Sequence, residues 1–329
     1  MTGHWNAPEI FALESATGNN NVYANGRQSI RVRMTIKVID INGEPAVLTE
    51  KERRSITLVN FHGNAELTYH DTWSSSPLNP AKGKWDWSVQ NNGGYSYFPS
   101  SGARTLSTEQ EVARAQSSDE AYIDFYLRTV DVTPFTVSAR ITRDDGTVFY
   151  SRNMAGGALL LSPVRPKSYR PADYYLEEVV IVPQRYLDGS KGQFGVGHLS
   201  YFRFGLNENP SLEFRDITCS PGGLHGDIGP GWTNEAATMV GYVKPGQKNI
   251  NYLFPLTYVD PELKWDPRPG QILLTKTYVQ ARPNNYFTQL LGRTAVLNTS
   301  LRATDEYGNV HQLNVRFKNN QRTGDIELV

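Results

Sequence analysis

Residues 30–38, IRVRMTIKV, alternate apolar and polar side chains without interruption. Successive side chains of a β-strand point to opposite faces, so this period of two predicts a strand with one buried face and one exposed face. Such strands belong to antiparallel sheets with one face in contact with solvent. Asn25-Gly26 before the strand and Asp40-Ile41-Asn42-Gly43 after it predict turns at its two ends. The face predicted to be buried carries Ile30, Val32, Met34, Ile36 and Val38.

The same design recurs twice. Residues 135–141 alternate and lead through Asp-Asp-Gly-Thr at 144–147 into a short apolar run at 148–150. Residues 297–303 lead in the same way through a turn into an alternating run at 313–317. Each segment predicts a β-hairpin, because a turn that accepts positive φ separates two patterned runs. Further strands are predicted at 55–61, 122–129, 176–182, 198–205, 212–218, 250–259 and 272–279.

Helical patterns are few and short. Thr-Glu-Lys-Glu at 49–52 fits a capping box but leaves room for only one or two turns before the next strand. Residues 107–115 form the best candidate for an α-helix. Many strands with almost no helix predict an all-β chain made of antiparallel β-sandwiches.

The length and the prolines indicate two domains. At about 100–200 residues per domain, a chain of 329 residues suggests two of them. Pro163, Pro166 and Pro171 cannot continue a central strand and favour an extended linker. The alternative is an interstrand loop within a single domain. We predict a first domain at 1–161, a Pro-rich linker at 162–171 and a second domain at 172–329.

The segment around the first strand is similar to a known kind of module. Ala24-Asn25-Gly26, the strand at 30–38 and Asp40-Ile41-Asn42-Gly43-Glu44-Pro45 resemble the start of bacterial Ig-like domains of the invasin and intimin type, and 135–141 resembles their closing strand. This resemblance covers residues 20–150 and implies an Ig-like sandwich, so the predicted fold is two antiparallel β-sandwich (Ig-like) domains with very short helices. Such modules serve as spacers, adhesin stalks or virion decorations and share no catalytic site, so no functional residue carries over.

The resemblance leaves part of the chain unexplained. Residues 62–120 have no place in the compact pattern of these modules, and we predict them to be a long aromatic-rich insertion in the first domain. The similarity also does not extend to residues 170–329.

Within the insertion, residues 70–102 hold several aromatic side chains among Ser, Asn, Gly and Pro. Flat rings near carboxylates and amides suit sugar binding, and the same composition occurs in adaptable protein-binding loops. The alternative is that Trp85-Asp86-Trp87 is a strand whose two indoles share one face and anchor the core. The predicted ligand-binding residues are Trp73, Trp85, Asp86, Trp87, Tyr95 and Tyr97.

Cys219 and His225, with Asp227 nearby, suggest a thiol nucleophile. No family signature surrounds the cysteine, and the glycines around it favour a surface loop. The alternative is an inert, buried cysteine at the end of the strand predicted at 212–218. The six histidines are scattered, and no HExxH, Asp-rich calcium loop or P-loop motif occurs. We therefore predict no catalytic residue, no metal site and no cofactor.

Charge and composition exclude several classes of partner. Lys and Arg number 33, as do Asp and Glu, so no net field draws the chain to nucleic acid or anionic lipid. The N-terminal residues carry neither a basic n-region nor an apolar h-region, and no run reaches the ~18 apolar residues of a membrane helix. We expect no Sec signal and synthesis in the cytoplasm, with release by lysis, in a particle or through a dedicated secretion system.

Three functions are consistent with these patterns. The first is a non-enzymatic binding or structural protein, surface-, particle- or virion-associated, that recognises a glycan or protein receptor through aromatic-rich loops and assembles as a homo-oligomer or particle. The second is a secreted toxin, pore-forming or insecticidal, in which a strand such as 30–38 enters a membrane, although Arg31, Arg33 and Lys37 interrupt it. The third is a hydrolase that uses Cys219 and His225, or the carboxylates Asp71 and Asp86.

Overall fold

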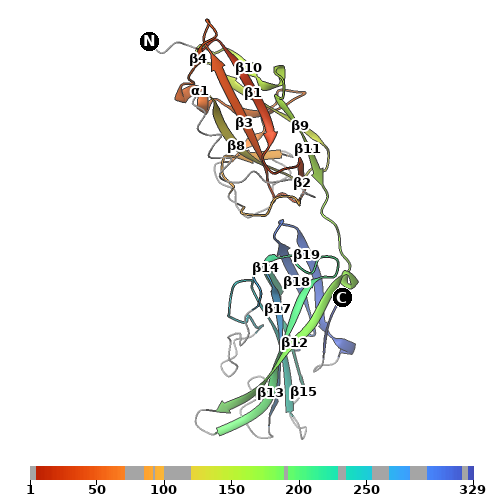
Figure 1. Cartoon of the computed structure of the whole chain (residues 1–329). Coiled ribbons are helices and arrows are strands. Elements are labelled where there is room, and N and C mark those ends of the chain that lie inside the picture. The colour runs from red at the N-terminus through yellow and green to blue at the C-terminus, as the bar shows by residue number, and fades with distance from the viewer. Residues whose placement is uncertain are drawn as a thin grey trace. The chain divides into compact units, whose positions relative to one another are not determined.

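The computed structural model describes residues 5–70, 85–91, 93–99, 120–188, 192–228, 235–253, 267–281, 295–320 and 325–329. Two compact units make up the chain, Met1–Pro166 with Tyr307–Asn309, and Lys167–Glu306 with Val310–Val329. Both consist of β-sheets (Figure 1), which confirms the predicted all-β class. The helical elements that the structure describes are short: α1 (Glu50–Arg54), η2 (Ser151–Asn153), η3 (Pro171–Asp173) and η5 (Lys318–Asn320). None of the described helices has the length and apolar character needed to cross a membrane.

The first unit is a sandwich of two sheets. Sheet 1 has the strand order β1-β3-β8-β7-β6 with β4 beside β3, and sheet 2 has the order β10-β9-β11-β2 with β5 beside β9. All pairings are antiparallel except β6 with β7 and β11 with β2, which are parallel. The strands of sheet 1 are β1 (Ala7–Ser15), β3 (Ile30–Ile39), β4 (Pro45–Ala46), β6 (Thr68–Tyr69), β7 (Trp85–Ser88) and β8 (Ala121–Thr129). Those of sheet 2 are β2 (Asn21–Tyr23), β5 (Thr57–Asn60), β9 (Phe135–Thr142), β10 (Val148–Tyr150) and β11 (Ala158–Val164).

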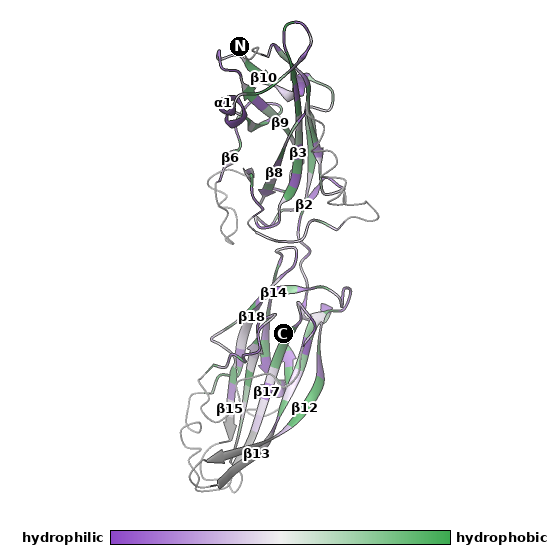
Figure 2. Cartoon of the chain, turned by 60° about the vertical axis from the view of Figure 1, so that its left-hand side comes forward, coloured by the Kyte–Doolittle hydropathy of each residue, from purple (hydrophilic) through white to green (hydrophobic). Residues whose placement is uncertain are grey.

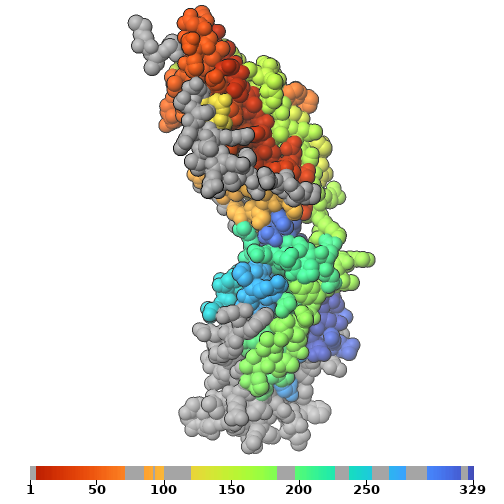
Figure 3. All heavy atoms as spheres, viewed as in Figure 1, coloured from red at the N-terminus to blue at the C-terminus, as the bar shows by residue number. Residues whose placement is uncertain are grey.

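Strand β3 confirms the prediction made from its alternation. Its five apolar side chains are at most 2% exposed and lie in the core between the two sheets. The hairpin after it closes as expected, because a carboxylate oxygen of Asp40 accepts the N–H groups of Asn42 (2.8 Å) and Glu44 (3.0 Å), and Gly43 takes a φ of 87°. Strand β1 lies beside β3 at the edge of sheet 1, on the surface of the first unit (deep red in Figure 3).

Strand β11 corrects part of the predicted linker. Residues 162–164 continue β11 and pair in parallel with β2, so only residues 165–170 lie between β11 and η3 without regular structure. The ladder bonds run from Ser162 N–H to Asn20 C=O (2.9 Å) and from Ala24 N–H to Val164 C=O (2.8 Å). Pro163 is tolerated because neither bond requires the N–H group that proline lacks.

The predicted insertion is, in its described parts, integral to the sandwich. Strand β7 pairs with β8 from Trp85–Thr129 to Ser88–Tyr126, and β6 extends sheet 1 beyond β7. Residues 68–69 and 85–88 are therefore strands of sheet 1, and the insertion at 62–120 stays a prediction. The helix predicted at 107–115 lies outside the described residues.

The second unit is also a sandwich of two sheets. Sheet 3 has the order β12-β13-β17-β16-β15, and the smaller sheet 4 has the order β14-β18-β19-β20. The strands of sheet 3 are β12 (Tyr174–Asp188), β13 (Gly192–Leu206), β15 (Leu224–Ile228), β16 (Glu235–Val243) and β17 (Ile272–Ala281). Those of sheet 4 are β14 (Phe214–Ser220), β18 (Asn298–Asp305), β19 (Val310–Phe317) and β20 (Ile326–Leu328). The apolar run 179–182 of β12 is green in Figure 2.

Both remaining hairpins form as predicted. The β9–β10 turn has Gly146 at a φ of 90°, and the β18–β19 turn has Gly308 at a φ of 81°. The strand predicted at 250–259 is described only at its start, where Asn251 forms an isolated bridge with Tyr242. Sequence patterns missed the strands β1, β2, β4, β6, β11, β15, β16 and β20, and the predicted glycine-rich loop after Cys219 contains β15.

Candidate functional site

A cleft in the first unit forms where β8 continues past the end of β7. Strand β3 pairs with β8 along residues 121–127, whereas β7 pairs with β8 only along residues 126–129. Among the described residues, no strand lies on the β7 side of β8 from 121 to 125. The side chains of Ala121, Ile123 and Phe125 point toward the sandwich interior at this place, and Ile123 is only partly covered.

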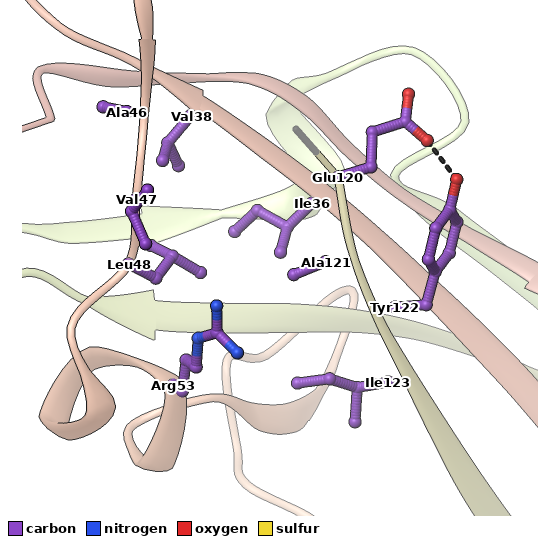
Figure 4. A pocket seen from close by; sticks show the side chains of 10 residues that line it. All are labelled: Ile36, Val38, Ala46, Val47, Leu48, Arg53, Glu120, Ala121, Tyr122 and Ile123. Atoms are coloured by element: carbon purple, nitrogen blue, oxygen red, sulfur yellow. Dashed lines mark hydrogen bonds between the residues drawn. The ribbon is translucent and has the colours of Figure 1, made fainter. Parts of the chain in front are cut away.

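The space beside these residues consists of two hollows that share Arg53 and Ile123, and we call the two together the α1 cleft. The first hollow, of about 330 Å³, is lined by aliphatic side chains of β3, the β4–α1 segment and β8, with Arg53 and Glu120 among them (Figure 4). The second, of about 490 Å³, is lined by Tyr69, Trp87, Val89 and Phe125 and by residues of α1 and β5. The cleft therefore combines apolar side chains with charged ones, among them Arg53, Arg54, Glu66, Glu120 and Arg140.

Helix α1 is held firmly at the cleft despite its length of five residues. The predicted capping box is present, since Thr49 Oγ1 accepts the Glu52 N–H (3.2 Å) and a Glu52 carboxylate oxygen accepts the Thr49 N–H (2.9 Å). The other oxygen of Glu52, which is 1% exposed, accepts the N–H of Asp144 in the β9–β10 turn (3.0 Å). The helix is thus fixed to sheet 2, and Arg53 has a defined position over the cleft.

Three large apolar side chains at the cleft are open to solvent. Val47 is 75% exposed, and Tyr69 and Val89 are each 45% exposed. The Tyr69 ring lies 4.6 Å from the Trp87 ring, centroid to centroid, so a buried indole supports an exposed phenol. Exposed apolar side chains gathered around a hollow are typical of binding surfaces.

The charges around the cleft are mostly paired. Arg54 contacts Glu50 (3.0 Å), Arg140 contacts Glu66 (2.6 Å), and the Tyr122 hydroxyl hydrogen-bonds to Glu120 (Figure 4). Arg53 is exposed and makes no ion pair with any described residue. Among the arginines of the cleft, Arg53 is therefore the one whose charge is available to pair with a negatively charged group of a ligand.

The outer face of sheet 1 carries a buried ion pair. Arg128 donates two hydrogen bonds to the carboxylate of Asp86 (2.9 and 3.1 Å), and His70 Nε2 lies 3.1 Å from the same carboxylate. Asp86 is 0% exposed, and burial raises the pKa of its carboxyl more than the hydrogen bond from Arg128 lowers it. This arrangement holds β7 to β8, since each strand contributes one member of the pair.

A second charged cluster lies further along the same face. Arg31 and Arg33 of β3 both bind the carboxylate of Asp124 on β8, with Nε–oxygen distances of 3.0 and 2.9 Å. Although burial raises the pKa of Asp124, the hydrogen bonds from Arg33 and Arg31 outweigh it and hold that pKa below its usual value. Two of the charges that interrupt the alternating strand therefore join β3 to β8.

The structure separates the predicted ligand-binding residues. Trp85 and Trp87 are 6% and 5% exposed and belong to the core, with the Trp85 ring stacked on that of Phe135 at 5.1 Å. The two indoles lie in the core, as the alternative expected, and ligand binding by Trp85 and Asp86 stays a prediction. Trp87 lines the second hollow of the α1 cleft. Trp73 lies outside the described residues.

Tyr95 and Tyr97 belong to a segment that is packed against the first unit. Both are half-buried, and burial raises the pKa of Tyr97 to about 12, with Tyr126 and Asp124 adding to the shift. The segment is held by a hydrogen bond from Gln28 Nε2 to the Ser96 carbonyl (2.8 Å). Ligand binding by Tyr95 and Tyr97 stays a prediction.

The suggested thiol nucleophile lacks the electrostatics that it needs. Cys219 lies in β14 against the core of the second unit, and burial raises the pKa of its thiol to about 12, the opposite of activation. His225, 0% exposed, lies in β15, where its backbone pairs with Val296. The alternative of an inert cysteine at a strand end describes this site.

We expect Cys219 to react slowly with iodoacetamide in the folded protein near pH 8, at least about a hundredfold more slowly than after unfolding in urea, because an unfolded thiol has a pKa near 8.5. Mass spectrometry of the alkylated chain measures both rates, and Cys219→Ser gives the background. Equal rates in the folded and unfolded protein would contradict a partly buried thiol whose pKa is raised.

A buried polar cluster in the second unit links its two sheets. The Tyr174 hydroxyl of β12 hydrogen-bonds to His311 Nδ1 (3.0 Å), and His311 Nε2 lies 3.2 Å from a carboxylate oxygen of Asp305. The three side chains are at most 7% exposed, so this cluster is a tie between sheets 3 and 4 without access for a ligand.

Comparison with known proteins finds similarity to solved structures, but no protein-family model and no curated protein matches the sequence. Among solved structures, the chain is similar to an adhesin of Yersinia pseudotuberculosis, InvE, with 11% sequence identity and a TM-score of 0.22, over 94% of this chain and 58% of the adhesin chain. So low a TM-score supports no inference about fold or function. The sheets show that the chain is all-β, as invasin-type modules are. Membership of that family stays a prediction.

Proposed function

We propose that the chain is a non-enzymatic binding protein whose first unit recognises a receptor at the α1 cleft. The observation that carries this proposal is the group of exposed apolar side chains at the α1 cleft, Val47 in its first hollow and Tyr69 and Val89 in its second, with Arg53 lining both hollows. Sandwich strands hold the walls in place, so a partner meets a preformed surface and little ordering is needed on binding.

The partner is a protein or glycan receptor, and the setting is a cell, particle or virion surface. Tyr69 supported by Trp87 offers a flat face that suits either partner. Tyr95 and Tyr97, partly exposed on the same unit, are a further contact region of this proposal.

Arrays of glycans and of synthetic peptides, probed with the labelled full chain, test the proposal. We expect Tyr69→Ser combined with Val89→Ser to weaken binding to the array by about tenfold or more, because central apolar anchors carry most of the energy of an interface. The control is Ile181→Ser combined with Val310→Ser, which removes exposed apolar side chains from the second unit. Array binding that only the control variant loses would contradict a site on the first unit.

A further inference from the structure

We infer that the α1 cleft takes an extended protein segment, which lies along β8 with apolar side chains in the cleft and a carboxylate opposite Arg53. This inference rests on the proposed function and adds the class of partner and its chemistry.

Strand β8 is paired unequally along its two sides. Strand β8 has β3 on one side along residues 121–127, and from 121 to 125 no described strand lies on its other side. A strand inside a sheet directs backbone N–H and C=O groups to both sides, so an added strand is a natural neighbour at such a place. Alternate side chains of the added strand would then face the sandwich interior, as those of β8 do.

The first hollow has a largely aliphatic lining. Ile36, Val38, Leu48, Ala121 and Ile123 are aliphatic, and the exposed Val47 stands at the margin. A sugar needs hydrogen-bonding partners for its hydroxyl groups and flat rings for its C–H faces. Among the residues that line this hollow, only Arg53, Glu120 and Tyr122 offer such groups, and Glu120 and Tyr122 are hydrogen-bonded to each other. Aliphatic side chains of a peptide bury well against such an aliphatic wall. The lining therefore favours a protein segment over a glycan.

The positive charge of Arg53 at the cleft is complementary to a carboxylate on the partner. Both hollows are lined by Arg53 and Ile123. Arg53 has no ion-pair partner among the described residues, whereas its neighbours are paired, Arg54 with Glu50 and Arg140 with Glu66. A guanidinium binds a carboxylate through two parallel hydrogen bonds, which gives orientation as well as affinity. The segment that fits is thus apolar at alternate positions and carries an Asp, a Glu or a terminal carboxylate near its centre.

Two pools of fluorescein-labelled synthetic peptides test this inference. Both have Val, Ile or Leu at alternate positions and Thr between them, one with a central Glu and the other with Gln. Fluorescence anisotropy with the full chain should show the Glu pool binding about tenfold or more tightly than the Gln pool. Arg53→Ala should abolish that difference, and Val47→Asp, at an exposed position, should weaken the binding of both pools.

Lys51→Ala is the matched control, because Lys51 carries the same charge on the same helix and contacts Asp144 rather than the cleft. It should leave the preference for Glu unchanged, and an equal loss in both variants would overturn the inference. If the chain bound glycans but no peptides, and Val47→Asp abolished the glycan binding, the inference would be overturned and the proposed function would stand. Self-association that Val47→Asp abolishes would assign the cleft to a second copy and overturn it too. Binding to neither peptides nor glycans would overturn both proposals.

Discussion

Arg128→Ala should lower the free energy of unfolding of the first unit by about 3–5 kcal/mol, because removing one member of a buried ion pair leaves the other without compensation. Asp86 would remain at 0% exposure with its two hydrogen bonds from Arg128 lost. His70 could neutralise the carboxylate only in part, since its side chain is 29% exposed and lies at the margin of the pair. Urea denaturation followed by tryptophan fluorescence measures the change.

The matched control is Arg54→Ala. It removes the same kind of side chain from an i,i+4 pair with Glu50 in which both side chains are at least 70% exposed. We expect a loss of about 0.3–0.5 kcal/mol, the usual value for such helix pairs. If both variants lost the same small amount, the pair of Arg128 and Asp86 would not be the tie between β7 and β8 that we describe.

The parts of the fold that the sequence predicts are those that depend on neighbouring residues. The alternation of β3 and the turn of Asp40 and Gly43 are local, so the strand and its following turn could be placed to within one residue. The capping box of Thr49 and Glu52 spans four residues and is equally readable. Local patterns do not specify which distant residues these elements contact, such as β1 and β8 beside β3 or Asp144 beside Glu52.

The elements that were missed depend on distant pairing. Residues 162–164 contain a proline and continue as a strand only because β2, from far earlier in the chain, supplies a parallel neighbour with a compatible hydrogen-bond pattern. Strand β15 contains Gly226 and follows two glycines, so its propensity indicates a loop, and its pairing with β16 overrides that propensity. Such tertiary effects leave no periodic signal in the sequence.

The α1 cleft could not be predicted from the sequence for a related reason. The aromatic spacing of Trp85 and Trp87 was correctly recognised, but whether the two rings face a ligand or the core depends on Phe135 and on the rest of sheet 2. The α1 cleft exists because β7 ends at Ser88 while β8 continues to Ala121, and that difference in length is a property of the assembled sheet. No local pattern marks Val47 or Arg53 as residues of a binding surface.

Trp85→Ala should destabilise the first unit by about 3–5 kcal/mol, the usual cost of removing a large aromatic side chain from a core. Its ring is stacked on Phe135 with an interplanar angle of 25°, so the truncation removes an aromatic contact between the two sheets as well as buried area. Urea denaturation followed by circular dichroism measures the loss independently of the removed fluorophore.

The comparison of Trp85→Phe with Tyr69→Ala separates core from binding surface. Phe keeps an aromatic ring beside Phe135, so this variant should fold and keep its binding to the peptide or glycan array. Tyr69 is 45% exposed, so its truncation should cost about 1 kcal/mol or less in stability but should weaken binding. The reverse result, in which Trp85→Phe stays folded and loses binding while Tyr69→Ala keeps it, would return the binding site to the strand of Trp85 and remove it from the α1 cleft.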